Sequence, residues 1–290
     1  MVNHFLAWLV MGFQSLAYAT LSGALLVVGV ALLLWWRGFA WLPLIGWSFT
    51  AAAVVVVIVL LVACMLVPTQ PTARQLGEGV RVAHLNVLFY SNFAFAEKLA
   101  FVQQSGADVV SLVEVPEKLG ELMIEQSGYP YHFQTSAPST GRNLPMLTLS
   151  RWPLKVAHQW SPRAMAFTVQ HPQTPFTFIQ LHPQSPYTPN AFAKRNVELA
   201  ALTSPTFPAP VVAVGDLNTT PWDNALHPLR QNLTFRGPWL PTFPSFMPLA
   251  PIDLVLSSPH WPTQNIQRVH VPGTDHLAIV ANFPTPPKQP

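Results

Sequence analysis

The hydrophobic pattern divides the 290-residue chain at about residue 68. Before this point, two apolar stretches follow one another at about 15–36 and 43–67. Each is as long as the roughly 20 residues that a helix needs to cross the hydrocarbon core of a bilayer. The pattern therefore predicts an N-terminal membrane region over 1–68 with two transmembrane helices.

Residues 35–41, where the first stretch ends, contain three Trp beside Arg37, which is typical of a membrane interface. The tendency of basic residues to face the cytoplasm places this loop inside and both termini outside. We therefore expect a multi-pass protein of a bacterial inner or plasma membrane with an extracytoplasmic C-terminal domain. A cleaved signal peptide is the alternative, because residues 61–64 resemble a lipoprotein cleavage box. An additional apolar run precedes that box, which argues against cleavage.

The pattern changes after the membrane region. Residues 69–79 are polar and rich in turn formers, which predicts a linker. From residue 80 to 89 apolar residues alternate as in a strand, and this period of two places His84 and Asn86 on the same face. A folded domain is predicted from here to residue 284, followed by a short tail over 285–290.

Several short strands and a few helices follow in mixed order. The predicted helices cover residues 94–104, 116–126 and 190–202. The predicted strands cover residues 107–113, 131–134, 144–149, 164–169, 176–181, 211–214, 252–256, 267–271 and 277–283. The 31 prolines also favour short strands and rigid loops. This order predicts an α/β domain in which two β-sheets pack face to face with helices on the outside.

Polar residues with the chemistry of metal ligands or acid-base groups lie at the ends of these strands. They are Asn86, Glu114, His182, Asp216, Asn218, Asp253, Asp275 and His276. Any one of them alone is explained by a turn or a helix end. The chain has only twelve acidic residues in total, so eight such positions together predict a functional site.

The motifs that contain these residues occur in a characteristic order. They are Leu85-Asn86-Val87, Val113-Glu114-Val115, Leu181-His182-Pro183, Gly215-Asp216-Leu217-Asn218, Pro251-Ile252-Asp253-Leu254-Val255 and Gly273-Thr274-Asp275-His276. In this order the chain resembles the endonuclease/exonuclease/phosphatase superfamily, which contains DNase I, apurinic endonucleases, bacterial sphingomyelinases and inositol polyphosphate phosphatases. The resemblance implies a four-layered α/β sandwich of DNase I-like type.

The same resemblance implies a divalent-cation site. Residues matching Asn86, Glu114 and Asp275 gather around the cation in the family, and oxygen ligands of this kind suit Mg²⁺, or Mn²⁺ as an alternative. Some family nucleases carry an Asp two residues after the Asn ligand, where this chain has Leu88. This difference favours chemistry with a single metal ion.

The remaining roles implied by the resemblance are those of a hydrolase. His276 is the general base or its electrostatic equivalent, and Asp253 orients it. Asp216 positions or deprotonates the attacking water, while His182 and Asn218 donate hydrogen bonds to the phosphate. Arg142 and His84 are further candidates for contact with a substrate phosphate.

These observations predict a Mg²⁺-dependent hydrolase that cleaves phosphodiesters or phosphomonoesters by in-line attack of water. A membrane-anchored nuclease is the first hypothesis. Of 15 basic residues, Arg37 and Arg74 precede Glu78, so 13 remain against 12 acidic residues, and this balance does not indicate a general nucleic-acid binder.

Two alternatives remain open. The first is a phospholipase C or sphingomyelinase-like enzyme. The N-terminal helices would hold such an enzyme at the bilayer that contains its substrate, and the apolar run 239–247 offers lipid contacts. The second is a membrane-tethered binding protein on a catalytically dead hydrolase fold. The presence of all eight strand-end residues argues against this second alternative.

Overall fold

The computed structural model describes residues 68–72, 79–91, 93–135, 144–202, 207, 210–235 and 240–287. Within these ranges, no helix combines the length and the apolar character needed to cross a bilayer. The two predicted transmembrane helices lie outside the described residues, and so does Arg142.

The first β-sheet has the strand order β11-β12-β1-β2-β4-β3. Strands β1 and β2 are parallel, and the other neighbours are antiparallel. In chain order the bounds are β1 Val80–Asn86, β2 Val109–Val113, β3 Tyr131–Gln134, β4 Met146–Ser150, β11 Asn265–Val269 and β12 Ala278–Phe283.

The second β-sheet has the strand order β5-β6-β7-β8-β10-β9. Here β7 and β8 are the parallel pair, again among antiparallel neighbours. The bounds are β5 Leu154–Ser161, β6 Ala164–Val169, β7 Phe176–Leu181, β8 Val211–Asp216, β9 Thr234–Phe235 and β10 Asp253–Ser257. Two mixed sheets of this kind are what the sequence predicted.

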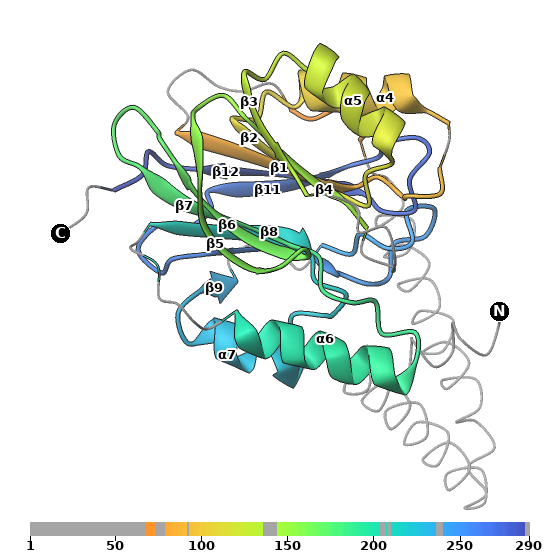
Figure 1. Cartoon of the computed structure of the whole chain (residues 1–290), viewed down its shortest axis with the longest axis vertical. Coiled ribbons are helices and arrows are strands. Elements are labelled where there is room, and N and C mark those ends of the chain that lie inside the picture. Colours follow the sequence, from red (N-terminus) through yellow and green to blue (C-terminus); the bar gives the residue numbers. More distant parts are fainter. Residues whose placement is uncertain are drawn as a thin grey trace, which may run out of the picture. The chain divides into compact units, whose positions relative to one another are not determined.

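The sheets pack face to face, and helices cover their outer faces (Figure 1). Helices α4 (Phe95–Gln104) and α5 (Glu117–Gln126) pack on the first sheet, and α6 (Pro189–Ala201) and α7 (His227–Arg230) pack on the second. A short 3₁₀ helix, η1 (Asn224–Leu226), precedes α7. Separate apolar clusters fill the space between the two sheets and the space under each helical layer. The result is a four-layered α/β sandwich.

The period of two along β1 assigns its side chains to two different cores. Val82 belongs to the cluster between the sheets, whereas Ala83 and Leu85 belong to the cluster under α4 and α5. His84 and Asn86 share the inter-sheet side with Val82 by this alternation. The strand therefore directs both polar side chains toward the second sheet.

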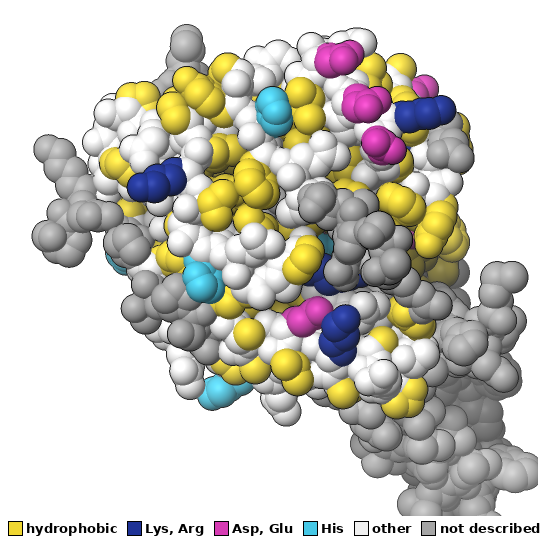
Figure 2. All heavy atoms as spheres, viewed as in Figure 1, with side chains coloured by type: hydrophobic (Ala, Val, Ile, Leu, Met, Phe, Trp, Pro, Cys, Tyr) yellow, Lys and Arg dark blue, Asp and Glu magenta, His cyan; other side chains and the backbone are white. Residues whose placement is uncertain are grey.

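The helices follow from local sequence signals. The Thr188 side chain caps α6 by accepting a hydrogen bond from the Ala191 N–H, and proline occupies the first helical turn. Helix α5 turns an acidic surface to solvent through Glu117, Glu121 and Glu125, and acidic side chains gather over this layer at the upper right of Figure 2.

The hydrophobic pattern missed β5, η1, α7 and the two-residue strand β9. Most of β5 is exposed or partly exposed, because it forms an edge of the second sheet and pairs only with β6, with two register shifts. An edge strand of this kind lacks the buried alternation that identifies strands in a sequence. The other three elements are too short to show a period.

A close approach of two strands depends on Gly215. A Cβ at this position would lie 1.8 Å from the carbonyl oxygen of Leu181 in β7. Any side chain would push β8 away from β7 at the point where Asp216 and His182 follow. The glycine therefore brings these two residues together.

Candidate active site

The register of the strands brings the predicted residues to one edge of the sandwich. In the second sheet Asp216 is the direct partner of Asp253, and Leu181, which precedes His182, pairs with Gly215. In the first sheet Asn86 pairs with the residue that precedes Glu114. Ordinary strand pairing thus assembles the cluster from segments far apart in the sequence.

Two residues of the cluster adopt the left-handed backbone conformation that favours glycine. Glu114, directly after β2, has a φ of 59°, and Asn218, two residues after β8, has a φ of 50°. Residues other than glycine occupy this region at a cost of roughly 1–3 kcal/mol, and they concentrate at functional sites. In both cases the turn follows a buried strand and keeps the side chain within the cluster.

Side-chain contacts join the two sheets. The Asn86 amide nitrogen donates to Asp216 Oδ2 at 3.1 Å, and His182 Nε2 lies 3.3 Å from Glu114 Oε1. The other Glu114 oxygen accepts from the Phe89 N–H at 3.3 Å. Burial alone would raise the pKa of Glu114, but His182 and the hydrogen bonds lower it to about 2. Glu114 is therefore an anion at neutral pH.

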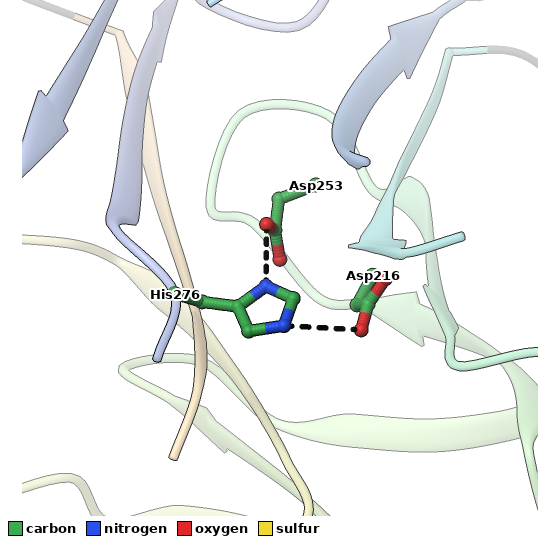
Figure 3. Close-up of side chains that lie close together, drawn as sticks. All are labelled: Asp216, Asp253 and His276. Carbon is green, nitrogen blue, oxygen red and sulfur yellow. Dashed lines mark hydrogen bonds and ion pairs between the residues drawn. The ribbon is translucent and has the colours of Figure 1, made fainter. Parts of the chain in front are cut away.

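His276 lies between two buried carboxylates (Figure 3). Its Nδ1 is 2.8 Å from Asp253 Oδ2, and its Nε2 is 3.7 Å from Asp216 Oδ2. Burial alone would lower the pKa of His276, but the charges of Asp253 and Asp216 raise it to about 10. Burial has the opposite effect on Asp216 and raises the pKa of that carboxyl. The imidazole thus holds a proton beside a carboxylate that binds a proton more readily than usual.

The residues predicted to hold a cation fit that role. Asp275 Oδ1 is buried, and no hydrogen-bond partner contacts it among the described residues. Burial and the negative charge of nearby Glu114 both raise the pKa of Asp275. Glu114 and Asp275 therefore lie close enough to repel each other, and a divalent cation would relieve both the repulsion and the unsatisfied oxygen.

A second group also has the spacing of a metal site. Ligand atoms of Asp216, Asp253 and His276 all lie within 4.8 Å of one another, and all three residues are buried. Every carboxylate oxygen of Asp253 and Asp216 already contacts a protein group, whereas Asp275 Oδ1 in the first group has no such partner among the described residues. Oxygen ligands at Asn86, Glu114 and Asp275 are the better match for Mg²⁺.

The sequence of the chain matches one family model across this site. Residues 86–276 match the model of the "Endonuclease/Exonuclease/phosphatase family", and this range contains all eight clustered residues. The chain belongs to this family. A comparison with curated protein sequences gives no significant match.

Several solved structures have a similar fold. An endonuclease/exonuclease/phosphatase protein from Beutenbergia cavernae is 19% identical with a TM-score of 0.56, and 72% of each chain is covered. Humanized D. rerio TDP2 is 14% identical with a TM-score of 0.56, over 71% of this chain and 99% of that one. The human Nocturnin catalytic domain is 14% identical with a TM-score of 0.53, over 70% and 93%. At these identities the comparison supports the DNase I-like fold.

Two of the residues predicted to contact phosphate, Asn218 and His84, make hydrogen bonds to protein groups. The Asn218 amide nitrogen donates to the Pro183 carbonyl at 3.0 Å, so the side chain ties the turn after β8 to the turn after β7. His84 is fully buried. Its Nδ1 lies 3.1 Å from Ser111 Oγ and its Nε2 lies 3.0 Å from Asp253 Oδ1, so both ring nitrogens contact protein groups.

Sequence reasoning missed the polar network behind the site. Gln180 Nε2 donates to Ser111 Oγ at 3.0 Å, and Ser111 in turn contacts His84. Thr148 Oγ1 donates to the Gln180 side-chain oxygen Oε1 at 2.7 Å. Ser111, Thr148 and Gln180 lie at inter-sheet positions of the alternating pattern in their strands. A polar residue at such an inward position was the sequence signal that could have identified this network. The network extends from the core to Asp253.

Two buried cations were also missed. Lys98 donates to Ser91 Oγ at 2.9 Å, and burial lowers its pKa to about 8 although the charge of Asp275 opposes the shift. Arg163 donates to the His182 carbonyl at 3.1 Å and lies near the charges of Glu114 and Asp216. Both cations offset part of the negative charge of the cluster.

The geometry predicts that His84 positions Asp253. Replacing His84 with Leu is expected to lower kcat about 10- to 100-fold and to leave KM nearly unchanged, because Asp253 loses one of its two histidine partners and no longer fixes His276. His84→Gln, which retains an N–H donor, is expected to recover part of the loss. Steady-state kinetics of both variants provide the measurement.

The matched control for this prediction is His158→Leu. His158 lies on the edge strand β5, where it packs against Trp160. If His84→Leu and His158→Leu have the same kcat, His84 has no positioning role.

Proposed function

We propose that the protein is a divalent-metal-dependent hydrolase of phosphodiesters or phosphomonoesters, with Mg²⁺ as the cation and Mn²⁺ as its substitute. The observation that supports this most directly is the connected set of Asp253, His276 and Asp216 next to the carboxylates of Glu114 and Asp275. Membership of the endonuclease/exonuclease/phosphatase family fits the same reaction class.

Asn86, Glu114 and Asp275 would hold the cation. When bound there, the cation offsets the charge of a phosphoryl oxygen and of the leaving oxygen. Asn86 links this group to the acid-base residues, since its amide nitrogen donates to Asp216.

In this proposal Asp216 and His276 are the acid-base residues. Asp216 accepts the proton of the attacking water, because burial raises the affinity of this carboxylate for protons. His276 keeps its own proton, and its Nε2 lies too far from Asp216 Oδ2 for a short hydrogen bond, so the N–H is available to a phosphate oxygen. Asp253 fixes the ring from the other nitrogen.

The overall reaction adds water across one ester bond. The water oxygen joins phosphorus, and the P–O bond on the opposite side breaks. Asp216 releases the proton it took to solvent, and the leaving oxygen takes up a proton from solvent. His182 Nε2 lies 3.3 Å from Glu114 Oε1, and its N–H would donate to a phosphate oxygen in place of this contact when substrate binds.

The membrane assignment is part of the same proposal. The apolar, acid-free sequence before residue 68 supports an anchor of two helices in a bacterial inner or plasma membrane, with the catalytic domain outside the cytoplasm. Protease added to intact cells is expected to remove the domain only after the outer layers are permeabilised. Cleavage that requires disruption of the inner membrane would place the domain in the cytoplasm.

The activity is tested with the full-length protein in detergent. Candidate substrates are plasmid DNA, single-stranded RNA, sphingomyelin, phosphatidylcholine and a chromogenic phosphodiester, each with Mg²⁺ and with EDTA. The D. rerio TDP2 structure with a single-strand DNA product makes nucleic acid a necessary part of this set. We expect hydrolysis that EDTA abolishes and added Mg²⁺ restores. The absence of hydrolysis of every substrate with metal present would favour a binding protein.

A further inference from the structure

Exposed apolar side chains gather on the loops that build the site. Among the described residues, seven large apolar side chains are exposed. Four of them lie on two loops, 87–94 and 241–251. They are Tyr90 (79% exposed), Phe93 (65%), Phe246 (77%) and Leu249 (37%). Tyr90, Phe93 and Phe246 are called the aromatic rim below. Exposed aromatic residues concentrated in this way indicate an interaction surface.

Backbone contacts place the two rim loops beside Glu114 and Asp275, and this side of the cluster is called the mouth of the site below. The Phe89 N–H, next to Tyr90, donates to Glu114, and the Ser245 N–H, next to Phe246, donates to the Asp275 carbonyl at 2.7 Å. The third site loop, 270–277, touches both of the others. Ser245 Oγ donates to the Thr274 carbonyl at 2.8 Å, and a Cβ on Gly273 would lie 3.2 Å from the Phe93 ring.

The apolar N-terminal sequence joins the domain beside this mouth. The Pro68 carbonyl accepts from the His270 N–H at 2.8 Å, and Thr72 donates from its N–H and its hydroxyl to Gln267 in β11. His270 precedes Asp275 by five residues, a span of at most about 18 Å even in a fully extended chain. If residues 1–67 form the proposed anchor, the chain therefore enters the domain beside the third site loop.

The charges around the rim favour lipid over nucleic acid. The exposed Lys and Arg residues among those described are Lys118, Arg151, Lys155, Lys194 and Arg230. None of them lies on the three site loops, whereas proteins that bind nucleic acid line their sites with cations that contact the phosphates. Aromatic side chains are favoured at the headgroup level of membranes. The lack of exposed cations on these loops further favours zwitterionic over anionic headgroups.

We propose that the aromatic rim docks on the surface of a zwitterionic phospholipid bilayer and presents the active site to lipid phosphodiesters. The substrate half of this inference rests on the proposed hydrolase function, whereas the docking half does not. In this arrangement the rim sets the orientation of the site loops toward the membrane.

Docking is tested by site-directed spin labelling of the full-length protein in phosphatidylcholine vesicles. Cys64, the only cysteine, is replaced with Ser, and single cysteines are introduced by Tyr90→Cys, Phe246→Cys and the control Val197→Cys. Val197 is 70% exposed on α6, away from the site loops. We expect labels at 90 and 246 to be accessible to oxygen in the lipid phase and shielded from an aqueous nickel complex. Labels at 90 and 246 that are as accessible to nickel as the label at 197 would overturn the docking.

The substrate class is tested by the ratio of two activities. The combined variant Tyr90→Ser, Phe93→Ser, Phe246→Ser is expected to lose at least about tenfold more activity on phosphatidylcholine in vesicles than on a soluble chromogenic phosphodiester, whereas Val197→Ser changes neither. Equal losses on both substrates would contradict a role of the rim in lipid delivery. Cleavage of single-stranded DNA without cleavage of vesicle lipid would replace the lipid substrate with nucleic acid.

Different results would contradict the proposed hydrolase function and the proposed docking of the rim. An enzyme inactive on every phosphodiester would remove the proposed function, and the spin labels would still decide whether the rim contacts the bilayer. Shielding of the labels by single-stranded DNA in detergent, with no shielding by vesicles, would assign the rim to base stacking and overturn the membrane surface.

Discussion

Replacing His276 with Gln is expected to lower kcat/KM on a phosphodiester by about 10³-fold or more. The imidazole lies between Asp253 and Asp216, and glutamine supplies neither its positive charge nor its two nitrogens in one rigid ring. Removal of a positioned acid-base group typically costs 10²- to 10⁴-fold, and loss of the charge beside the phosphate adds to this. Steady-state kinetics with saturating Mg²⁺ measure the effect.

The matched control is His171→Gln. His171 accepts backbone hydrogen bonds from Gln173 and Thr174 just beyond β6, where no clustered residue lies. Circular dichroism confirms that both variants are folded. A His276→Gln protein that retains more than about a tenth of the activity would remove His276 from the mechanism.

Replacing Asp216 with Asn is expected to reduce kcat by about 10³- to 10⁴-fold, because an amide cannot take the proton of the attacking water. The stability cost is expected to be about 1–3 kcal/mol, since both Asp216 oxygens accept hydrogen bonds and an amide can accept only at one. Single-turnover kinetics and urea unfolding measure the two effects separately.

Asp108→Asn separates the two effects. Asp108 is an equally buried carboxylate and accepts a hydrogen bond from the Arg81 N–H. Asp108 directly precedes β2, whereas Glu114 directly follows it, so the two lie at opposite ends of this strand. It is expected to lose stability and to keep turnover. If Asp108→Asn and Asp216→Asn lose turnover equally, the loss reflects destabilisation and not the proton transfer assigned to Asp216.

The fold was largely predictable because its strands are buried and regular. The alternation along β1 and the apolar runs of β7 and β8 identify strands directly, and proline and threonine mark the start of α6. The edge strand β5 was not predictable in this way, since its side chains face solvent in an irregular pattern.

The residues of the site could be predicted from the sequence, but most of the contacts between their side chains could not. Strand ends and motif order identified the eight polar positions, and strand register then brings them together. The orientation of His84 depends on Ser111 in a neighbouring strand and on Asp253 in the other sheet. Contacts between segments so far apart have no signature in the local sequence, so the contacts of His84 with Ser111 and Asp253 were not predicted.

The same reasoning applies to the aromatic rim. The apolar run 239–247 suggested lipid contacts, and within its described part Phe246 is the exposed member. Tyr90 and Phe93 were not singled out, because the sequence does not show that the loop after β1 lies next to the loop before β12. The contact of Phe93 with the Gly273 position reveals this neighbourhood.

The most direct test of the account is calorimetric titration of Mg²⁺ into the metal-free full-length protein. We expect one ion per chain, and a loss of affinity of about tenfold or more in Glu114→Gln and in Asp275→Asn, because each removes an oxygen anion from the cation site. Glu117→Gln, on the exposed first turn of α5, is expected to bind as the wild type does. Wild-type affinity in both Glu114→Gln and Asp275→Asn would contradict the assignment of the cation to this cluster.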